Sequence, residues 1–218
     1  MLRIHLNFRI MIWLTDTIAF PGYEHTSKEG VIALGGDLSV ERLTNAYKNG
    51  IFPWFSEEDP IVWYCPFERM VLFPEEIKIS KSMQKIILKK AFTITENTNF
   101  EAVIYNCKNT DRKDGFGTWI TNDMEQAYIN LHKKGIAKSI EVWYKDELVG
   151  GLYGLEINNI FCGESMFSKV SNASKLAFIH LAKSEKYKLI DCQIYNAHLA
   201  SLGAREVHRA LFLKILKG

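Results

Sequence analysis

Three apolar segments joined by two very short polar turns constrain the fold of this chain more than any other feature. The segments 137–144, 148–157 and 160–168 have the composition of β-strands, and only Lys145-Asp146-Glu147 and Asn158-Asn159 separate them. Connections this short make each strand pair with the strand next to it in the sequence. The three segments therefore predict an antiparallel meander.

Helical patterns surround this meander in the sequence. Helices are expected over residues 80–90 and 99–107, over 122–134 with Asn122 as its cap, and after Asn172, which is expected to cap the next one. Strands are expected over 92–95 and 188–194, followed by one more helix and a last strand. This order predicts an α+β fold. It matches the layout of GNAT-type acyltransferases, in which an acyl donor and an amine meet where neighbouring strands separate.

The first part of the chain differs from the rest, so two domains are predicted, 1–70 and 71–218. Four of the five prolines lie in the first part: Pro21, Pro53, Pro60 and Pro66. One short helix is expected there, with Ser39 as its N-cap and Gly50 just after its end. We expect a small irregular N-terminal domain packed by aromatics, and a GNAT-like C-terminal domain with a mixed sheet flanked by helices.

Composition excludes several classes of protein. With 218 residues, 47% hydrophobic and 24% charged, the chain is not disordered. No run approaches the roughly 20 apolar residues that cross a bilayer. Polar residues interrupt the apolar N-terminus (1–14) and no small-residue cleavage site follows, so we expect no secretory signal and a cytoplasmic protein.

Cysteine, histidine and charge patterns narrow the choice further. The four cysteines are too far apart for a zinc motif or a disulfide framework, and we expect buried reduced thiols. The six histidines are scattered, so no metal site is predicted. Lys and Arg number 27 against 25 Asp and Glu, so contact with nucleic acid would need a local basic patch.

Two segments carry candidate catalytic residues. Glu164 follows Gly163 among apolar residues, and a glutamate in such surroundings needs a partner or shifts its pKa. Strand alternation places Asp191 and Gln193 on one face, and the apolar residues between and beside them on the other. A carboxylate and a carboxamide can accept from an ammonium and donate to an oxyanion. The alternative for all three residues is a solvent-facing position.

Two tryptophans and a lysine stripe are candidate nucleic-acid contacts. Trp54 follows Pro53 and Trp119 follows Gly117-Thr118, and an aromatic ring on a loop can stack on a base, although core packing is the usual role of tryptophan. Four lysines follow one another in steps of 3, 4 and 4 residues, which places them within an arc of roughly 80° around a helix: Lys78, Lys81, Lys85 and Lys89. Such a stripe either contacts a phosphate backbone or forms only a solvated face.

Sequence motifs for other chemistries are absent. The chain has no GxxxxGK[ST] loop, GxGxxG loop, HExxH or GxSxG. The glycines of Gly150-Gly151-Leu152-Tyr153-Gly154 lie within a predicted strand, so they indicate close backbone packing or a pocket wall and not a pyrophosphate site.

These residues, taken together, resemble the bacterial leucyl/phenylalanyl-tRNA–protein transferase family from about residue 19 to 213. The motifs that carry the resemblance are Ala33-Leu34-Gly35-Gly36-Asp37-Leu38-Ser39, Ala46-Tyr47, Gly50-Ile51-Phe52-Pro53-Trp54-Phe55, Gly117-Thr118-Trp119-Ile120, Ser139-Ile140-Glu141-Val142-Trp143, residues 148–154 and 163–168, Asn172-Ala173-Ser174-Lys175, Asp191-Cys192-Gln193 and Ser201-Leu202-Gly203-Ala204.

The resemblance implies a cytoplasmic enzyme that moves Leu or Phe from aminoacyl-tRNA to the α-amine of a protein beginning with Arg or Lys. The added residue marks that protein for degradation by the N-end rule pathway. The family uses no acetyl-CoA, other cofactor or metal. Because one methylene changes binding in an apolar pocket by only about 1–3 kcal/mol, some transfer of Met is also expected.

The resemblance also implies roles for individual residues. Trp54 and Trp119 look like the stacking partners of the terminal adenosine of the tRNA. Leu152, Phe161 and Gly163 would help line the apolar pocket for the donor side chain. The four lysines occupy the basic region of the family and would hold the acceptor stem.

Three residues are similar to the reaction centre of the family. Asp191 and Gln193 match the pair implicated in aminoacyl transfer, and Glu164 lies at the centre. Aminolysis of an activated ester needs a neutral amine, correct positioning and a stabilised tetrahedral intermediate. We expect Asp191 to orient and help deprotonate the acceptor ammonium, directly or through Gln193, and Glu164 to help bind the cationic acceptor.

The chain departs from the family pattern in three segments. Trp63-Tyr64-Cys65-Pro66-Phe67-Glu68-Arg69 replaces Trp-Trp-Ser-Pro-Asp-Pro-Arg, Lys78-Ile79-Ser80-Lys81-Ser82 replaces His-x-Ser-Arg-Ser, and Ala137-Lys138-Ser139 replaces Ala-His-Ser. The lysines keep positive charge but lose planar stacking and bidentate geometry. The sequence also ends at Gly218, without a usual family tail.

Three alternatives remain open from the sequence. One is an acyl-CoA-dependent GNAT-type N-acyltransferase, which would need a phosphate-binding loop. Another is a non-catalytic tRNA-binding module that uses the tryptophans and lysines. The third is transfer to a different N-terminal residue, such as Asp or Glu.

Overall fold

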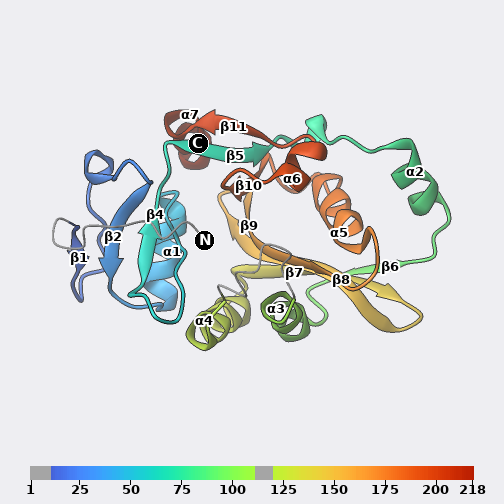
Figure 1. The fold of residues 1–218 in the computed structure, drawn as a ribbon, viewed down its shortest axis with the longest axis horizontal. Helices are drawn as coiled ribbons and strands as arrows, with labels where there is room; N and C mark the ends of the chain where they lie inside the picture. Colours follow the sequence, from blue (N-terminus) through green and yellow to red (C-terminus); the bar gives the residue numbers. More distant parts are fainter. Residues whose placement is uncertain (1–10, 111–119) are drawn as a thin grey trace.

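The computed structural model describes residues 11–110 and 120–218, whose strands form two mixed sheets (Figure 1). The smaller sheet lies at one end of the molecule and has the order β1-β2-β4-β3. Its strands are β1 (Trp13–Leu14), β2 (Val31–Gly35), β3 (Phe52–Pro53) and β4 (Val62–Tyr64). Only β1 and β2 run parallel in this sheet.

The larger sheet has the order β11-β5-β10-β9-β8-β7-β6, and only β9 and β10 run parallel in it. Its strands are β5 (Glu68–Leu72), β6 (Thr93–Glu96), β7 (Ala137–Tyr144), β8 (Glu147–Ile157), β9 (Ile160–Ser168), β10 (Leu189–Gln193) and β11 (Arg205–His208). The meander predicted over 137–168 is confirmed. Lys145, Asp146, Asn158 and Asn159 all have positive φ angles, as tight hairpin turns require.

Helices cover both faces of the larger sheet. Helices α3 (Phe100–Lys108) and α4 (Asn122–Lys133) pack on one face, and α5 (Ala173–Ala182) packs on the other (Figure 1). The remaining helices are α1 (Val40–Lys48), α2 (Lys81–Leu88), α6 (Ala197–Ser201), α7 (Arg209–Lys217) and the 3₁₀ turns η1 (Tyr23–His25) and η2 (Pro74–Glu76). The predicted combination of helices and mixed sheet is therefore confirmed, while the GNAT-like topology stays a prediction.

Helix ends follow the sequence with three exceptions. Ser39 caps α1 as predicted, but Thr121 and not Asn122 caps α4, because the Thr121 hydroxyl accepts from the Met124 N–H. Asn172 precedes α5 in a left-handed conformation without a capping bond. The chain also continues past its last strand into α7, which the sequence analysis missed.

The glycines of β8 allow α5 to pack close to the sheet. A Cβ atom on Gly150 would lie 2.5 Å from the Cβ of Ala173, at the start of α5. A Cβ on Gly154 would lie 2.3 Å from the carbonyl oxygen of Cys162 on β9. The prediction that these glycines serve close backbone packing is confirmed.

The hydrophobic core is continuous across residue 70. One cluster of buried side chains contains Trp63 of the small sheet, Tyr128 of α4, Cys162 of β9 and Phe212 of α7. A second cluster lies between the large sheet and α5. The division into domains 1–70 and 71–218 stays a prediction, since strand β5 of the large sheet already begins at Glu68.

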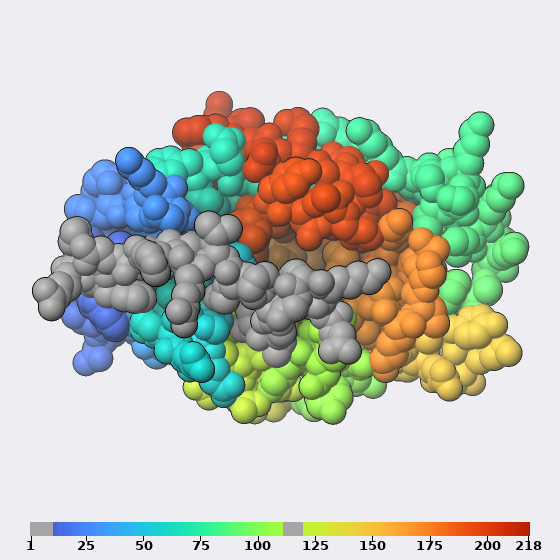
Figure 2. Space-filling view, in the orientation of Figure 1, coloured from blue at the N-terminus to red at the C-terminus, as the bar shows by residue number. Residues whose placement is uncertain are grey.

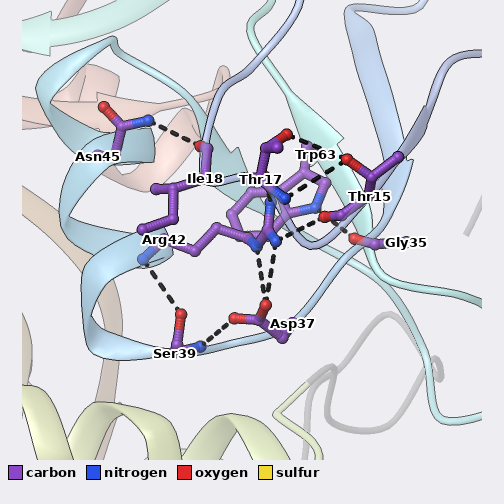
Figure 3. Close-up of polar contacts among 9 residues, drawn as sticks. All are labelled: Thr15, Thr17, Ile18, Gly35, Asp37, Ser39, Arg42, Asn45 and Trp63. Atoms are coloured by element: carbon purple, nitrogen blue, oxygen red, sulfur yellow. Dashed lines mark hydrogen bonds and ion pairs between the residues drawn. The ribbon is translucent and has the colours of Figure 1, made fainter.

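A buried arginine explains the Gly-Gly-Asp motif (Figure 3). The Arg42 side chain, fully buried on α1, donates to the carbonyl oxygens of Thr15 and Thr17 at 2.9 Å each. It also makes two bonds to Asp37 Oδ2, at 3.0 and 3.1 Å. The backbone N–H of Ser39 donates to Asp37 Oδ1 at 2.8 Å. Asp37 therefore holds the arginine that anchors residues 15–17 to α1.

We expect Asp37→Ala to lower the free energy of unfolding by about 1–2 kcal/mol, because Arg42 and the Ser39 N–H both lose an acceptor. Asp37→Asn should cost less, since its side-chain oxygen still accepts from Ser39. Urea denaturation of the two variants measures the difference. Equal losses for Ala and Asn would show that the bond to Ser39 contributes nothing.

Candidate active site

A cavity of about 450 Å³ opens between β9, β10, α5 and α6. Figure 2 shows this recess between the red C-terminal residues and the orange helix α5. All the described residues predicted for catalysis and donor binding line it: Trp54, Leu152, Phe161, Gly163, Glu164, Asp191 and Gln193. The structure thus brings together residues that are up to 139 positions apart in the sequence (193−54).

The cavity forms where the two parallel strands of the large sheet separate. Pairing between β9 and β10 runs from Ile160 and Leu189 to Cys162 and Asp191, and it stops there. Beyond this point β9 pairs only with β8, and β10 only with β5. Side chains that follow the last pair can therefore point into the space between the strands.

Two β-bulges lie at this fork. Tyr153 pairs with Ser165 and Gly154 pairs with Gly163, so Glu164 is an extra residue in β9. Cys192 is the extra residue in β10, between the pairs that Asp191 and Gln193 make with β5. A bulge bends its strand and changes the direction of a side chain. The bulges bring Gln193 Nε2 to 2.7 Å from Glu164 Oε1.

The predicted alternation along β10 is wrong beyond Asp191. The bulge interrupts it, and Gln193 has a φ of 64°, a left-handed conformation that is strained for glutamine. Asp191 and Gln193 still lie together, because the Gln193 N–H donates to Asp191 Oδ1 at 2.9 Å. Cys192 lines the same cavity and does not face away from it.

Glu164 is held by three hydrogen-bond donors. Its carboxylate accepts from the hydroxyls of Tyr47 at 2.6 Å and Tyr128 at 2.8 Å, and from Gln193. Burial raises the pKa of Glu164 to about 7, the two tyrosine hydrogen bonds act to lower it, and the charge of Asp191 raises it. A carboxyl group with this pKa can accept or release a proton near neutral pH.

Asp191 has a different environment, in which a buried arginine occupies both of its oxygens. Arg69 Nε donates to Oδ1 at 2.8 Å and Nη2 to Oδ2 at 2.6 Å, and both side chains are buried. Arg69 also donates to the carbonyl oxygen of Gly50 at 3.1 Å. Its guanidinium carbon lies 4.6 Å from the centroid of the Phe52 ring and 4.6 Å from that of the Phe212 ring. Asp191 is therefore a fixed anchor for β10.

Apolar side chains form the inner wall of the cavity. Leu152 is 3% exposed and Phe161 is 1% exposed. Further apolar lining comes from Met166, Phe178, Leu181, Ile190 and Leu199, among others. Gly163 lies beside the Asp191 carbonyl oxygen, 3.3 Å from where a Cβ would stand. This wall suits a branched or aromatic side chain.

Of the predicted nucleic-acid contacts that the structure describes, only Trp54 lines the cavity. Trp54 is half-buried at the cavity, and Trp119 lies outside the described residues. The four lysines are exposed, do not line the cavity and lie on and beside α2 at the end of the molecule (Figure 1). Lys78 precedes the helix, contrary to the prediction, because the Ser80 side chain caps α2.

Four residues at the site were not among the predicted ones. Tyr47, Arg69 and Tyr128 are buried behind the cavity, so only their place in apolar segments could have indicated them. His198 of α6 lines the cavity, and its Nε2 atom is buried without a hydrogen-bond partner among the described residues. Long-range contacts of this kind leave no periodic signal in a sequence.

Cys65, Cys107 and Cys162 are buried as expected, and Cys192 is half-buried. Residues 11–110 and 120–218 contain no group of three or more His, Cys, Asp and Glu side chains placed to bind a metal ion. No helix in these ranges has the length and hydropathy to span a membrane.

Comparison with known proteins gives consistent matches. Residues 71–217 match the model of the family described as leucyl/phenylalanyl-tRNA protein transferase, and residues 36–66 match the model of its N-terminal domain. The leucyl/phenylalanyl-tRNA–protein transferase of Flavobacterium johnsoniae is 58% identical over 95% of this chain and 99% of its own length. That of Flavobacterium psychrophilum is 53% identical over 95% and 100%. Among solved structures, FemX covers 82% of this chain and 71% of its own at 11% identity, with a TM-score of 0.49.

Proposed function

Because the chain belongs to the leucyl/phenylalanyl-tRNA–protein transferase family, we propose that its cavity is where Leu or Phe passes from aminoacyl-tRNA to a protein. The chain is an aminoacyltransferase, with aminoacyl-tRNA as donor and a protein as acceptor. The observation that carries the proposal is the meeting of an apolar pocket and a hydrogen-bonded carboxylate at the fork of β9 and β10.

The apolar wall receives the side chain of the donor. Leu152 and Phe161 offer buried carbon surface to it. Leu, Phe and, less well, Met bury their side chains there, because polar side chains would lose their hydration without a partner. Trp54 at the cavity stacks on the terminal adenosine, and Trp119 is proposed for the same role.

The acceptor is the α-amine of a protein that begins with Arg or Lys, and the product is marked for N-end rule degradation in the cytoplasm. The carboxylates at the fork support a cationic acceptor, since Glu164 lies at the cavity. The lysines on and beside α2 hold the acceptor stem through its phosphates. A GNAT-like arrangement of the C-terminal domain belongs to the same proposal.

Glu164, and not Asp191, accepts the proton of the substrate in this proposal, because Arg69 already donates to both oxygens of Asp191. The acceptor ammonium gives one proton to ionised Glu164, and the neutral amine attacks the carbonyl carbon of the ester. The bond from this carbon to the ribose oxygen then breaks, and the leaving oxygen takes the second proton from nitrogen. The products are an amide, a free tRNA hydroxyl and a proton that Glu164 returns to water.

Asp191 and Gln193 position the groups that take part in this transfer. Asp191 fixes the Gln193 backbone through its Oδ1 atom, and Gln193 positions Glu164 and donates to the developing oxyanion. Single-turnover rates of Asp191→Asn and Gln193→Ala test the two residues. Near-normal rates in both variants would remove them from the mechanism.

One assay tests the function as a whole. The protein is incubated with labelled Phe-tRNA and peptides that begin with Arg, Lys, Asp, Glu or Ala. Transfer to the Arg and Lys peptides alone is expected. Transfer to Asp or Glu would show a different acceptor class, and tRNA binding without any transfer would contradict the assignment as a transferase.

Enlarging Leu152 should change donor selection. We expect Leu152→Trp to lower Phe transfer more than Leu transfer, because an indole in the wall removes the space that the larger donor needs. Competition between Leu-tRNA and Phe-tRNA measures the ratio of products. Leu152→Met, which nearly conserves volume, is the control and should keep the ratio of the unchanged protein. An unchanged ratio in Leu152→Trp would show that this residue is not part of the wall.

A further inference from the structure

Two tyrosines that do not line the cavity nevertheless contact its central carboxylate. Tyr47 lies on α1 and is 1% exposed, and Tyr128 lies on α4 and is fully buried. Their hydroxyls bond to different oxygens of Glu164, at 2.6 and 2.8 Å. The two hydroxyl oxygens are 2.5 Å apart, within hydrogen-bond distance of each other. Because each hydroxyl has one proton, only two of these three contacts carry a phenol proton at a time, and at least one phenol donates to ionised Glu164.

Both phenols keep their protons at neutral pH. Burial, together with the charge of Glu164, raises the pKa of Tyr47 and that of Tyr128 well above the ordinary range. Each phenol therefore keeps the one proton that it donates, either to Glu164 directly or to the other phenol. A hydrogen bond that a phenol donates to an ionised carboxylate is about twice as strong as a bond between neutral groups, so it favours the ionised form.

We propose that Tyr47 and Tyr128 are positioning residues that favour the ionised form of Glu164 near neutral pH, and so set the pH range in which this enzyme accepts the proton of its substrate. This inference rests on the proposed function, in which Glu164 takes that proton. Burial and Asp191 favour the protonated carboxyl, while the phenols and Gln193 favour the ionised carboxylate. The two tyrosines favour the ionised form from buried positions that do not line the cavity.

Other titratable groups around Glu164 do not replace these donors. They are Arg69 on β5, Tyr153 on β8, Cys162 on β9, Asp191 on β10 and His198 on α6. Arg69 is bound to Asp191, and burial raises the pKa of Cys162 so that it stays neutral. Burial and Lys175 lower the pKa of His198, so it is neutral as well.

The pH profile of single-turnover transfer tests the proposal. In the unchanged protein the rate should fall as the pH drops through about 7, where Glu164 takes up a proton. Tyr47→Phe and Tyr128→Phe each remove one donor and should move this acidic limb upward by about one pH unit. At pH 6.5 each variant should be about tenfold slower, and near pH 9 it should approach the rate of the unchanged protein. A purely structural role would lower the rate by the same factor at every pH.

The matched control is a second tyrosine–glutamate pair. The Tyr187 hydroxyl donates to Glu156 at 2.9 Å, outside the cavity. Tyr187→Phe should leave the acidic limb in place. A shift of the limb in this control equal to that in Tyr128→Phe would overturn the proposal, since it would show that the loss of any such bond has the same effect.

An infrared titration separates this inference from the proposed function. The carboxylic-acid band that disappears in Glu164→Gln reports the protonation of Glu164 without any substrate. Its midpoint should rise by about one pH unit in Tyr47→Phe and in Tyr128→Phe. An unmoved midpoint in both variants overturns the inference, even if Glu164→Gln is inactive. A shifted midpoint together with transfer by Glu164→Gln supports the effect of the tyrosines on Glu164 but overturns its role in setting the pH range of the reaction. Both phenylalanine variants keep the ring volume, and either one suffices if the other does not fold.

Discussion

Arg69→Met is expected to lower the free energy of unfolding by about 3–5 kcal/mol, because it leaves the Asp191 carboxylate buried without its partner. Arg69 also bonds to the carbonyl oxygen of Gly50 and lies between two aromatic rings, so contacts from three parts of the chain are lost. Urea denaturation measures the loss, and transfer activity should fall with it because Asp191 no longer holds β10 in place.

The double variant Arg69→Met/Asp191→Leu is the control for this prediction. It removes both charges, so most of the lost stability should return. Activity should not return, since Gln193 loses its bond to Asp191. A loss below about 1 kcal/mol in Arg69→Met alone would contradict the view that this ion pair anchors the fork.

Glu164→Gln should lower the single-turnover rate by about 10²–10⁴-fold, the range expected when a proton acceptor is removed. The control is Glu156→Gln, which changes a carboxylate that also accepts from a tyrosine but lies outside the cavity. It should keep full activity. A rate for Glu164→Gln within threefold of the unchanged protein would remove Glu164 as proton acceptor.

Glu164→Gln should also stabilise the folded protein above neutral pH. The pKa of Glu164 in the folded protein is about 7, above its ordinary value of 4.5, so the folded protein holds a proton that the unfolded chain has released. This bound proton contributes up to about 3 kcal/mol to the free energy of unfolding. The contribution is complete below pH 4.5 and is lost as the pH rises through 7. Glu164→Gln should therefore be more stable than the unchanged protein by about 1–3 kcal/mol at pH 8 and by little at pH 5. Thermal unfolding at the two pH values measures this difference.

Local chemistry made much of the fold predictable. Ser39, Ser80 and Asn99 cap their helices because a short polar side chain before an apolar pattern satisfies the first backbone N–H groups. The turns at Lys145-Asp146 and Asn158-Asn159 follow in the same way from residues that tolerate positive φ. These signals act within a few residues, so one sequence contains them completely.

The candidate site was predictable only in part. Glu164, Asp191 and Gln193 were found from their polarity in apolar strands and from the family resemblance, and all three line one cavity. The bulges at Glu164 and Cys192 were not predicted, because a bulge depends on the register of two strands. Tyr47, Arg69 and Tyr128 were missed as members of the site because their partners are distant in the sequence. Tyr128 lies 36 residues and Tyr47 lies 117 residues from Glu164, and Arg69 lies 122 residues from Asp191.

The position of Arg69 between Phe52 and Phe212 has a consequence for how the protein matures. Phe212 belongs to the last helix, so a nascent chain that is still being translated lacks one of the two rings that enclose this guanidinium. The enclosure on both sides of the guanidinium that holds Asp191 is therefore complete only after α7 has been synthesised and has packed.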